Sequence, residues 1–205
     1  GIGMVHQHFM LVEAMTVFEN IILGDKSAKG IFINKDTRKK EILELSERYG
    51  LDVELDKQIS EISVGAQQRI EIIKALYRGA ELLVLDEPTA GLDPQGVSEL
   101  LHLLDDIRKT MGITVVLSTH DIDLVPLYCD EVFVMDKGAV VFGGTPDELF
   151  SHPGLLREHN LRLPRINHLM NILYDKDGLD VDQTASTISQ ARRTIRELAG
   201  KSKTN

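Results

Sequence analysis

The sequence predicts an α/β fold in which helices flank a parallel sheet. Two observations predict it. Short apolar runs at 82–86, 113–119 and 131–135 alternate with helical patterns at 95–109 and 121–128. Within each run the apolar residues are consecutive rather than alternate, which is typical of strands buried on both faces of a parallel sheet. We therefore expect these strands to share one sheet that is covered on both faces.

The elements before this region follow from local signals. Residues 2–7 predict a short strand, and 17–23 the opening of a helix that Gly24 ends. Apolar positions 42, 45 and 49, followed by Gly50, predict an amphipathic helix over 37–49. Ser63 can cap a further helix that stops at Gly79.

The elements after residue 135 are shorter. The pattern predicts, in chain order, a tight turn at 136–138, a hairpin strand at 139–144, helices at 146–151 and 153–174 with a break at Pro164, and a charged helix near 184–199.

Composition limits the possible functions. The 205 residues, 42% hydrophobic, suffice for one domain with a small appendix. No apolar run approaches the roughly 20 residues that cross a bilayer, so a membrane role is expected to come through a partner. The first residues show neither a basic region nor a cleavage site, so export is not expected. A single cysteine, Cys129, fits a reducing cytoplasm, and the net charge of -9 argues against nucleic acid as the main partner.

Two acidic residues follow the strand at 82–86. Asp86 stands at its carboxyl end, the edge where open α/β sheets place ligands. A carboxylate there can hold the magnesium ion of a nucleotide, while Glu87 can orient an attacking water. A capped strand end is the bland interpretation, and these residues alone leave both open.

His120 ends the next predicted strand. Sequential strands are usually neighbours, so His120 is expected close to Glu87, where it could donate to a γ-phosphate oxygen. A lone histidine is more often structural. Two adjacent strand ends that carry Asp-Glu and His favour the functional interpretation.

Two further motifs have competing interpretations. Ser63 and Gly65 begin a helix, where free backbone N–H groups favour a phosphate, but the same residues also suit an ordinary serine cap. His6 and His8 form an H-x-H pair that lacks further metal ligands, so a structural or surface role is the preferred interpretation.

The chain contains no phosphate loop of the form G-x-x-x-x-G-K-[ST]. The nearest candidates, GDKSAKG at 24–30 and GGTP at 143–146, have the wrong spacing. Such a loop supplies most of the charge neutralisation that a bound triphosphate needs.

Taken together, these motifs resemble a known family. The run ISVGAQQRIEIIKALYRGAELLVLDEPTAGLD at 62–93 is similar to the signature motif, Walker B motif and D-loop of ATP-binding cassette (ABC) ATPases. STHD at 118–121 resembles their switch histidine, and GMVHQ at 3–7 the strand that leads to the Q-loop glutamine. The resemblance covers about residues 1–175. It implies a P-loop NTPase-like parallel sheet with an α-helical subdomain, and ATP and Mg²⁺ as cofactors.

The resemblance also implies roles for the residues at the strand ends. Asp86 would be the magnesium carboxylate, Glu87 the general base or water-orienting residue, and His120 the γ-phosphate sensor. Gln7 would link the magnesium site to a permease.

Other residues would serve the interface between two ATPase subunits. Asp93 would be the D-loop aspartate at that interface. Ser63, Gly65 and Gln67 would touch the γ-phosphate of ATP bound by the opposite subunit. Ala66 replaces the more usual Gln or Glu of the signature. A polar side-chain contact to the phosphate is therefore lost at this position, while the backbone amides at the helix end remain.

The two halves of the chain resemble different branches of the family. Residues 1–85 look like ATPases of nucleoside and simple-sugar importers, and 86–175 like those of cobalt and nickel energy-coupling importers. The family pattern divides the chain into three parts. These are an incomplete ATPase core of 1–7 and 66–150, a helical signature subdomain of 8–65, and a C-terminal helical extension of 151–205.

The absence of the loop makes the chain look N-terminally truncated, and we expect no meaningful ATPase activity from it alone. The preferred hypothesis is the ATP-hydrolysing subunit of an importer, peripheral on the cytoplasmic face of the membrane, paired with permease subunits and a second ATPase in a homo- or heterodimer. One alternative is a non-catalytic chain that dimerises with or regulates a complete ATPase. A cassette ATPase of DNA repair or translation is weaker, because the chain is acidic and lacks a long coiled-coil insertion.

Overall fold

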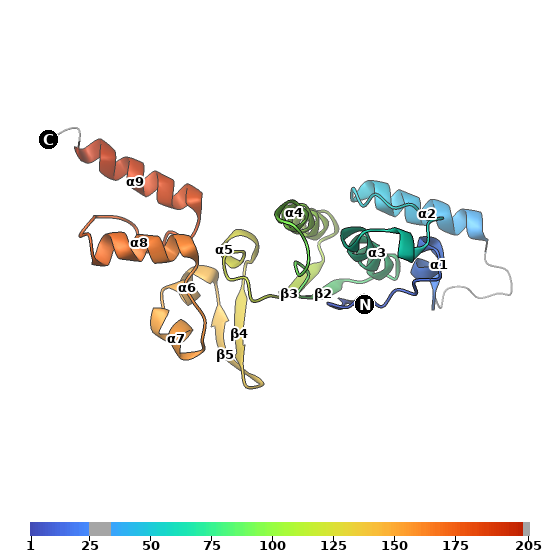
Figure 1. The fold of residues 1–205 in the computed structure, drawn as a ribbon, viewed down its shortest axis with the longest axis horizontal. Helices are drawn as coiled ribbons and strands as arrows, with labels where there is room; N and C mark the ends of the chain where they lie inside the picture. Colours follow the sequence, from blue (N-terminus) through green and yellow to red (C-terminus); the bar gives the residue numbers. More distant parts are fainter. Residues whose placement is uncertain (25–33, 203–205) are drawn as a thin grey trace. The chain divides into compact units, whose positions relative to one another are not determined.

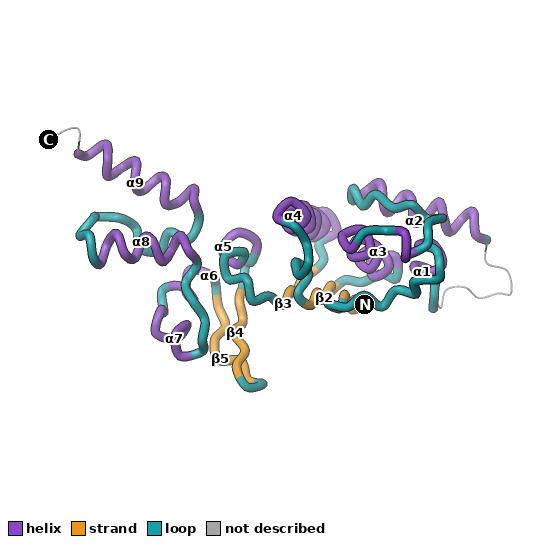
Figure 2. The backbone as a smooth tube through the Cα atoms, in the orientation of Figure 1, coloured by secondary structure: helices purple, strands orange, loops and turns teal. Residues whose placement is uncertain are grey.

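The computed structural model describes residues 1–24 and 34–202, so most of the GDKSAKG run lies outside the described residues. The chain divides into two compact units, residues 1–120 and 121–205 (Figure 1). Each unit has its own hydrophobic core and is described by itself. Helices dominate both units, and the strands gather in two short groups (Figure 2).

The first unit is built on a three-stranded parallel sheet in the order β1 (Ile2–Val5), β2 (Leu82–Asp86) and β3 (Thr114–Ser118). Parallel neighbours require crossover connections, which here consist of helices. The crossovers contain α1 (Val17–Ile22), α2 (Lys35–Arg48), the short 3₁₀ helix η1 (Ile59–Glu61), α3 (Val64–Tyr77) and α4 (Pro94–Met111).

The sheet is covered on one face within this unit. Leu83 and Leu85 are fully buried in the core, whereas Ile2, Met4 and Val116 are 77%, 49% and 48% exposed. Helices α3 and α4 lie on the same side of the strands (Figure 1). The order β1-β2-β3 advances in one direction, so two crossovers of the usual right hand fall on one face. The expectation of helices on both faces is therefore wrong for the described part of this unit.

Local signals set the helix boundaries as predicted, with small shifts. Thr16 and Glu19 form a capping box at the start of α1. Asn34 caps α2, which makes that helix begin two residues earlier than predicted. Gly24 and Gly50, with φ of 78° and 62°, take the left-handed conformation that ends a helix.

The second unit joins a hairpin to a series of helices. Its elements are α5 (Val125–Tyr128), β4 (Val132–Asp136), β5 (Ala139–Gly144), α6 (Pro146–Phe150), α7 (Pro153–Glu158), α8 (Arg165–Asp175) and α9 (Ile188–Ser202). Strand β4 pairs antiparallel with β5, so its predicted place in the parallel sheet is wrong. The predicted hairpin itself is present: Lys137 and Gly138 both have positive φ and form its two-residue turn.

The C-terminal helix also differs from the prediction, beginning at Ile188 rather than near residue 184. Asp182 Oδ1 accepts hydrogen bonds from the backbone and hydroxyl of Thr184, at 2.9 and 2.6 Å. Gln190 Oε1 accepts from the backbone N–H groups of Ser186 and Thr187, both at 3.0 Å. These side-chain bonds give the backbone of 182–187 an alternative to the helix.

Across residues 1–24 and 34–202, no helix combines the length and apolar character required to cross a membrane. The predicted division into core, helical subdomain and extension stays a prediction.

Candidate functional site

The carboxyl ends of β2 and β3 meet at one edge of the parallel sheet. Asp86 and Ser118 are partners in the strand register. The Ser118 hydroxyl donates a hydrogen bond of 2.6 Å to Asp86 Oδ1. The predicted strand-end carboxylate is therefore held in one orientation by its neighbour.

Glu87 follows directly and takes an unusual backbone conformation, with φ of 45°. Its amide donates to both oxygens of Ser118, the carbonyl at 3.2 Å and the hydroxyl at 3.1 Å. Its Oε1 lies 2.9 Å from His120 Nδ1. The structure thus brings together Asp86, Glu87 and His120, which the sequence placed on adjacent strand ends.

The site keeps unused polar capacity. Glu87 Oε2 is buried and has no hydrogen-bond partner among the described residues. A buried carboxylate oxygen without a partner is costly unless water, an ion or a ligand satisfies it. The Glu87 side chain is 21% exposed and that of His120 is 86% exposed, so the histidine is open to an incoming group. An oxygen-rich donor set of this kind suits Mg²⁺ and an ordered water.

The start of α3 shows the serine cap. Ser63 Oγ accepts from the Ala66 amide at 3.3 Å, so the ordinary cap is present. A Cβ on Gly65 would meet only Leu92 Cδ2, at 3.8 Å, which leaves space above the helix end. Gln67 Nε2 turns back to the carbonyls of Ile59 and Ile62, at 3.4 and 3.3 Å. The predicted phosphate contacts of Ser63, Gly65 and Gln67 stay predictions.

Two other predicted residues lie near chain turns. Asp93 caps α4, with Oδ1 accepting from the Gly96 amide at 2.7 Å. Gln7 is exposed beyond the end of β1. Their predicted roles at a dimer interface and a permease link are not tested by these positions.

Sequence reasoning missed two polar residues at this edge. Ser118 bridges Asp86 and Glu87, and the buried Gln68 side chain donates to the Pro88 carbonyl. Matching the predicted strand ends, 86 and 119, would have placed Thr119 opposite Asp86, so only the observed register identifies Ser118. Gln68 gave no signal either, because its partner is a backbone group in a turn.

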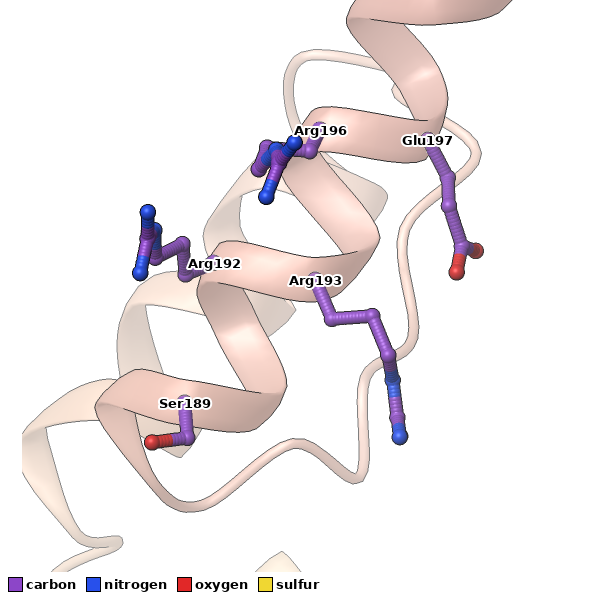
Figure 3. Close-up of a pocket in the computed structure, with 5 residues that line it drawn as sticks. All are labelled: Ser189, Arg192, Arg193, Arg196 and Glu197. Atoms are coloured by element: carbon purple, nitrogen blue, oxygen red, sulfur yellow. The ribbon is translucent and has the colours of Figure 1, made fainter.

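A hollow of about 430 Å³ lies on α9 and is lined by none of the predicted site residues (Figure 3). Ser189, Arg192, Arg193, Arg196 and Glu197 line it. The arginine side chains extend from one helix into open surroundings rather than converging on an enclosed site. The strand ends, where complementary groups converge, are therefore the candidate site.

The remaining candidates offer little chemistry. Within residues 1–24 and 34–202, His6 and His8 belong to no group of three His, Cys, Asp or Glu residues that could hold a metal ion. Burial, together with the neighbouring Asp130, raises the pKa of the Cys129 thiol and disfavours its reactive thiolate. These residues keep structural interpretations.

The fold and the site together are those of a nucleotide-binding α/β protein: a parallel sheet with Asp86, Glu87 and His120 at its carboxyl edge. The comparisons with known proteins agree, since the family model described as ABC transporter matches residues 1–90. The chain belongs to the ABC transporter ATPase family, whose members bind ATP.

Relatives from both predicted branches are similar to the chain. The energy-coupling factor transporter ATP-binding protein EcfA3 of Clostridium perfringens is 44% identical over 186 residues, 91% of this chain and 64% of the relative. The nucleoside import ATP-binding protein NupA of Lactococcus lactis is 54% identical over 138 residues, 67% of this chain and 27% of the relative. The chain therefore spans 64% or less of the length of these curated relatives.

Solved structures show the same cassette fold. The structure of cbiO1 from Clostridium perfringens, described as part of the ABC transporter complex cbiONQ, has a TM-score of 0.64 and 42% identity. It covers 83% of this chain and 67% of that structure. The dimeric bacterial ABC transporter cassette MJ0796 has a TM-score of 0.59 and 27% identity, over 71% of this chain and 62% of that one.

Proposed function

We propose that the chain is the ATP-hydrolysing subunit of an ABC importer, coupling hydrolysis to solute uptake. The observation that carries the proposal is the convergence of Asp86, Glu87 and His120 at one sheet edge, with a buried Glu87 oxygen left unsatisfied. Relatives named as energy-coupling factor and nucleoside import ATP-binding proteins support the importer assignment.

Each residue then has a task in water attack on the γ-phosphate. Asp86 would hold Mg²⁺, directly or through water, with the carboxylate that Ser118 orients. ATP would supply the electrophilic γ-phosphorus, and its magnesium ion would offset the negative charge of the phosphates. Glu87 would position the attacking water, and His120 would donate to a γ-phosphate oxygen from its exposed position.

The partners follow from the same proposal. A second cassette subunit, identical or different, would face Ser63, Gly65, Gln67 and Asp93 across a shared ATP. Dimeric structures of the similar cassette MJ0796 support such a pairing. Gln7 would transmit closure to membrane-spanning permease subunits, which places the chain on the cytoplasmic face, where ATP is available. The solute would be either a cobalt or nickel ion or a nucleoside or simple sugar.

Because residues 1–205 contain no phosphate loop, the test uses the tagged chain joined at Gly1 to a phosphate-loop segment, purified from detergent-solubilised membranes of cells that express it. We expect membrane-spanning subunits to co-purify and the complex to hydrolyse ATP, with hydrolysis lost in Glu87→Gln. Uptake of labelled cobalt and of labelled nucleoside then identifies the solute class. Recovery without a membrane-spanning partner, or hydrolysis equal in the Glu87→Gln complex, would overturn the proposal.

A further inference from the structure

We infer that Ser118 is a positioning residue for the proposed site, fixing the Asp86 carboxylate and the Glu87 backbone at once. The inference rests on the proposed function, because it concerns how Asp86 is presented to a divalent cation. Ser118 is the first residue of the STHD run, but the sequence interpretation assigned a role only to His120 in that run.

The Ser118 hydroxyl is committed in both of its hydrogen-bonding capacities. A serine hydroxyl has one donor and two acceptor positions. The donor is used on Asp86 Oδ1 at 2.6 Å, the length of a charge-assisted bond to a carboxylate. One acceptor position receives the Glu87 amide at 3.1 Å. One hydroxyl therefore ties the two acidic residues together.

The first bond decides which Asp86 oxygen is open. With Oδ1 occupied by Ser118, no group of the described residues donates to Oδ2. Because Asp86 and Ser118 are register partners on parallel strands, their side chains point to the same side of the sheet. The hydrogen bond from Ser118 therefore orients the carboxylate and leaves its second oxygen without a donor among the described residues.

The second bond supports a costly backbone turn. A left-handed conformation costs an L-residue about 1–2 kcal/mol, and Glu87 adopts it with φ of 45°. Two acceptors of Ser118 hold the Glu87 amide, while its Oε1 lies 2.9 Å from His120 Nδ1. Without the hydroxyl, the Glu87 amide would keep only the Ser118 carbonyl as an acceptor.

If the Ser118 hydroxyl only stabilised the fold, its loss would not weaken cation binding at Asp86. Strand β3 offers a matched control for this distinction. Thr114, at the opposite end of β3, has an exposed side chain, and its hydroxyl makes no hydrogen bond within the described residues. Thr114→Val removes a hydroxyl from the same strand without touching the acidic pair. Ser118→Thr keeps the hydroxyl, and Ser118→Cys replaces it with a weaker donor of similar size.

The experiment measures Mn²⁺ binding to the full chain by electron paramagnetic resonance, with MnCl₂ alone as the probe. Removing a partner that orients a metal ligand typically weakens metal affinity about 10- to 100-fold. We expect about tenfold weaker Mn²⁺ binding in Ser118→Ala and an intermediate loss in Ser118→Cys. Ser118→Thr and Thr114→Val should bind as the unmodified chain does, and Asp86→Asn should lose this site.

A second measurement uses amide hydrogen exchange without metal. Exchange at Glu87 should accelerate in Ser118→Ala and return toward normal in Ser118→Thr, while exchange at Leu83 in the same strand stays unchanged. If Ser118→Ala fails to fold, Ser118→Cys carries both measurements.

The outcomes separate the inference from the proposed function. Equal Mn²⁺ binding in Ser118→Ala and the unmodified chain, with loss in Asp86→Asn, would overturn the role of Ser118 and leave the cation site standing. Binding that Asp86→Asn does not change would remove the cation site, and the inference would fall with it. Equal loss in Ser118→Thr and Ser118→Ala would also count against the hydroxyl.

Discussion

At the scale of single residues, the site depends on a contact between a partly buried glutamate and an exposed imidazole. His120 Nδ1 lies 2.9 Å from Glu87 Oε1, and Glu87 Oε2 has no partner among the described residues. The histidine therefore orients the glutamate, and its side chain is 86% exposed at the sheet edge. Because one carboxylate oxygen of Glu87 lacks a hydrogen-bond partner, the site is suited to bind a water or a ligand rather than to stabilise the fold.

Replacing this histidine should slow hydrolysis in the assembled transporter. We expect His120→Ala to lower kcat about 10²-fold, the loss typical when one donor to transition-state charge is removed. Phosphate release by the purified complex measures it. His168→Ala, at an exposed position on α8, is the matched control and should retain full activity. An unchanged rate in His120→Ala would show that the ring does not act on the phosphate.

A second residue-scale effect concerns acid stability in the second unit. Burial opposes ionisation of Asp123, but hydrogen bonds from Arg162 at 2.7 Å and from the Arg165 amide at 2.7 Å prevail and lower its pKa. A carboxyl group whose pKa is lowered by folding stabilises the folded state above its unfolded pKa of about 3.9. That contribution is lost as pH falls through the folded value.

Asp123→Asn should therefore destabilise residues 121–205 at neutral pH, and the difference from the unmodified chain should shrink below about pH 4. Urea denaturation at a series of pH values, followed by circular dichroism, measures it. Asp177→Asn, at an exposed loop position, should give no such pH-dependent difference. A difference that persists undiminished at pH 2 would contradict the ionic explanation.

At the scale of secondary structure elements, β1 and the end of α3 pack without spare room. A Cβ added to Gly3 would lie 2.7 Å from Ala75 Cβ and 3.0 Å from Ala80 Cβ. Neither neighbour is the flexible end of a long side chain, so the strand or the helix would have to shift. The glycine is thus required by close approach rather than by its backbone angles.

Gly3→Ala should destabilise the first unit by about 1–3 kcal/mol, the usual cost of overpacking a close contact. Chemical denaturation measures it, and the double variant Gly3→Ala with Ala75→Gly tests the cause. Removing the Ala75 methyl group should recover part of the loss, so the two changes should cost less together than their sum. Full additivity would mean that these two residues do not clash.

The elements also show what the sequence can predict and where it stops. Residues 82–86 form a strand as predicted. The run is too short for a helix, because it lies between a helix that ends at a glycine and a turn. Local sequence could not predict that both crossovers lie on one face, since that depends on strand order. The β4–β5 hairpin was predicted from its turn, which is a local signal, whereas the place of 131–135 in the parallel sheet was wrong because it depends on long-range pairing.

The same limit applies to the site. Asp86, Glu87 and His120 could be found because each ends or follows an apolar run, and strand ends gather at one edge of a parallel sheet. Ser118 could not be singled out from composition, because a serine at a strand end is common. Only the register that pairs it with Asp86 gives its hydroxyl two partners.

At the scale of the whole molecule, the balance of charges at the site limits what residues 1–205 can hold. Asp86 and Glu87 bring two carboxylates, and His120 brings one imidazole. These groups suit a cation and a water, but they do not neutralise a triphosphate. The 205 residues contain no G-x-x-x-x-G-K-[ST] run, whose amides and lysine supply that neutralisation in nucleotide sites.

A polypeptide of residues 1–205 alone should therefore not bind magnesium ATP with micromolar affinity. Equilibrium dialysis of the Glu87→Gln variant, which prevents turnover, measures this without loss of nucleotide. The matched arm adds a phosphate-loop segment upstream of Gly1, and there binding should appear, because the loop neutralises the charge that the acidic pair cannot. Micromolar binding without the added segment would mean that another part of this chain cradles the phosphates. Absence of binding in both arms would instead count against the acidic pair as a nucleotide site.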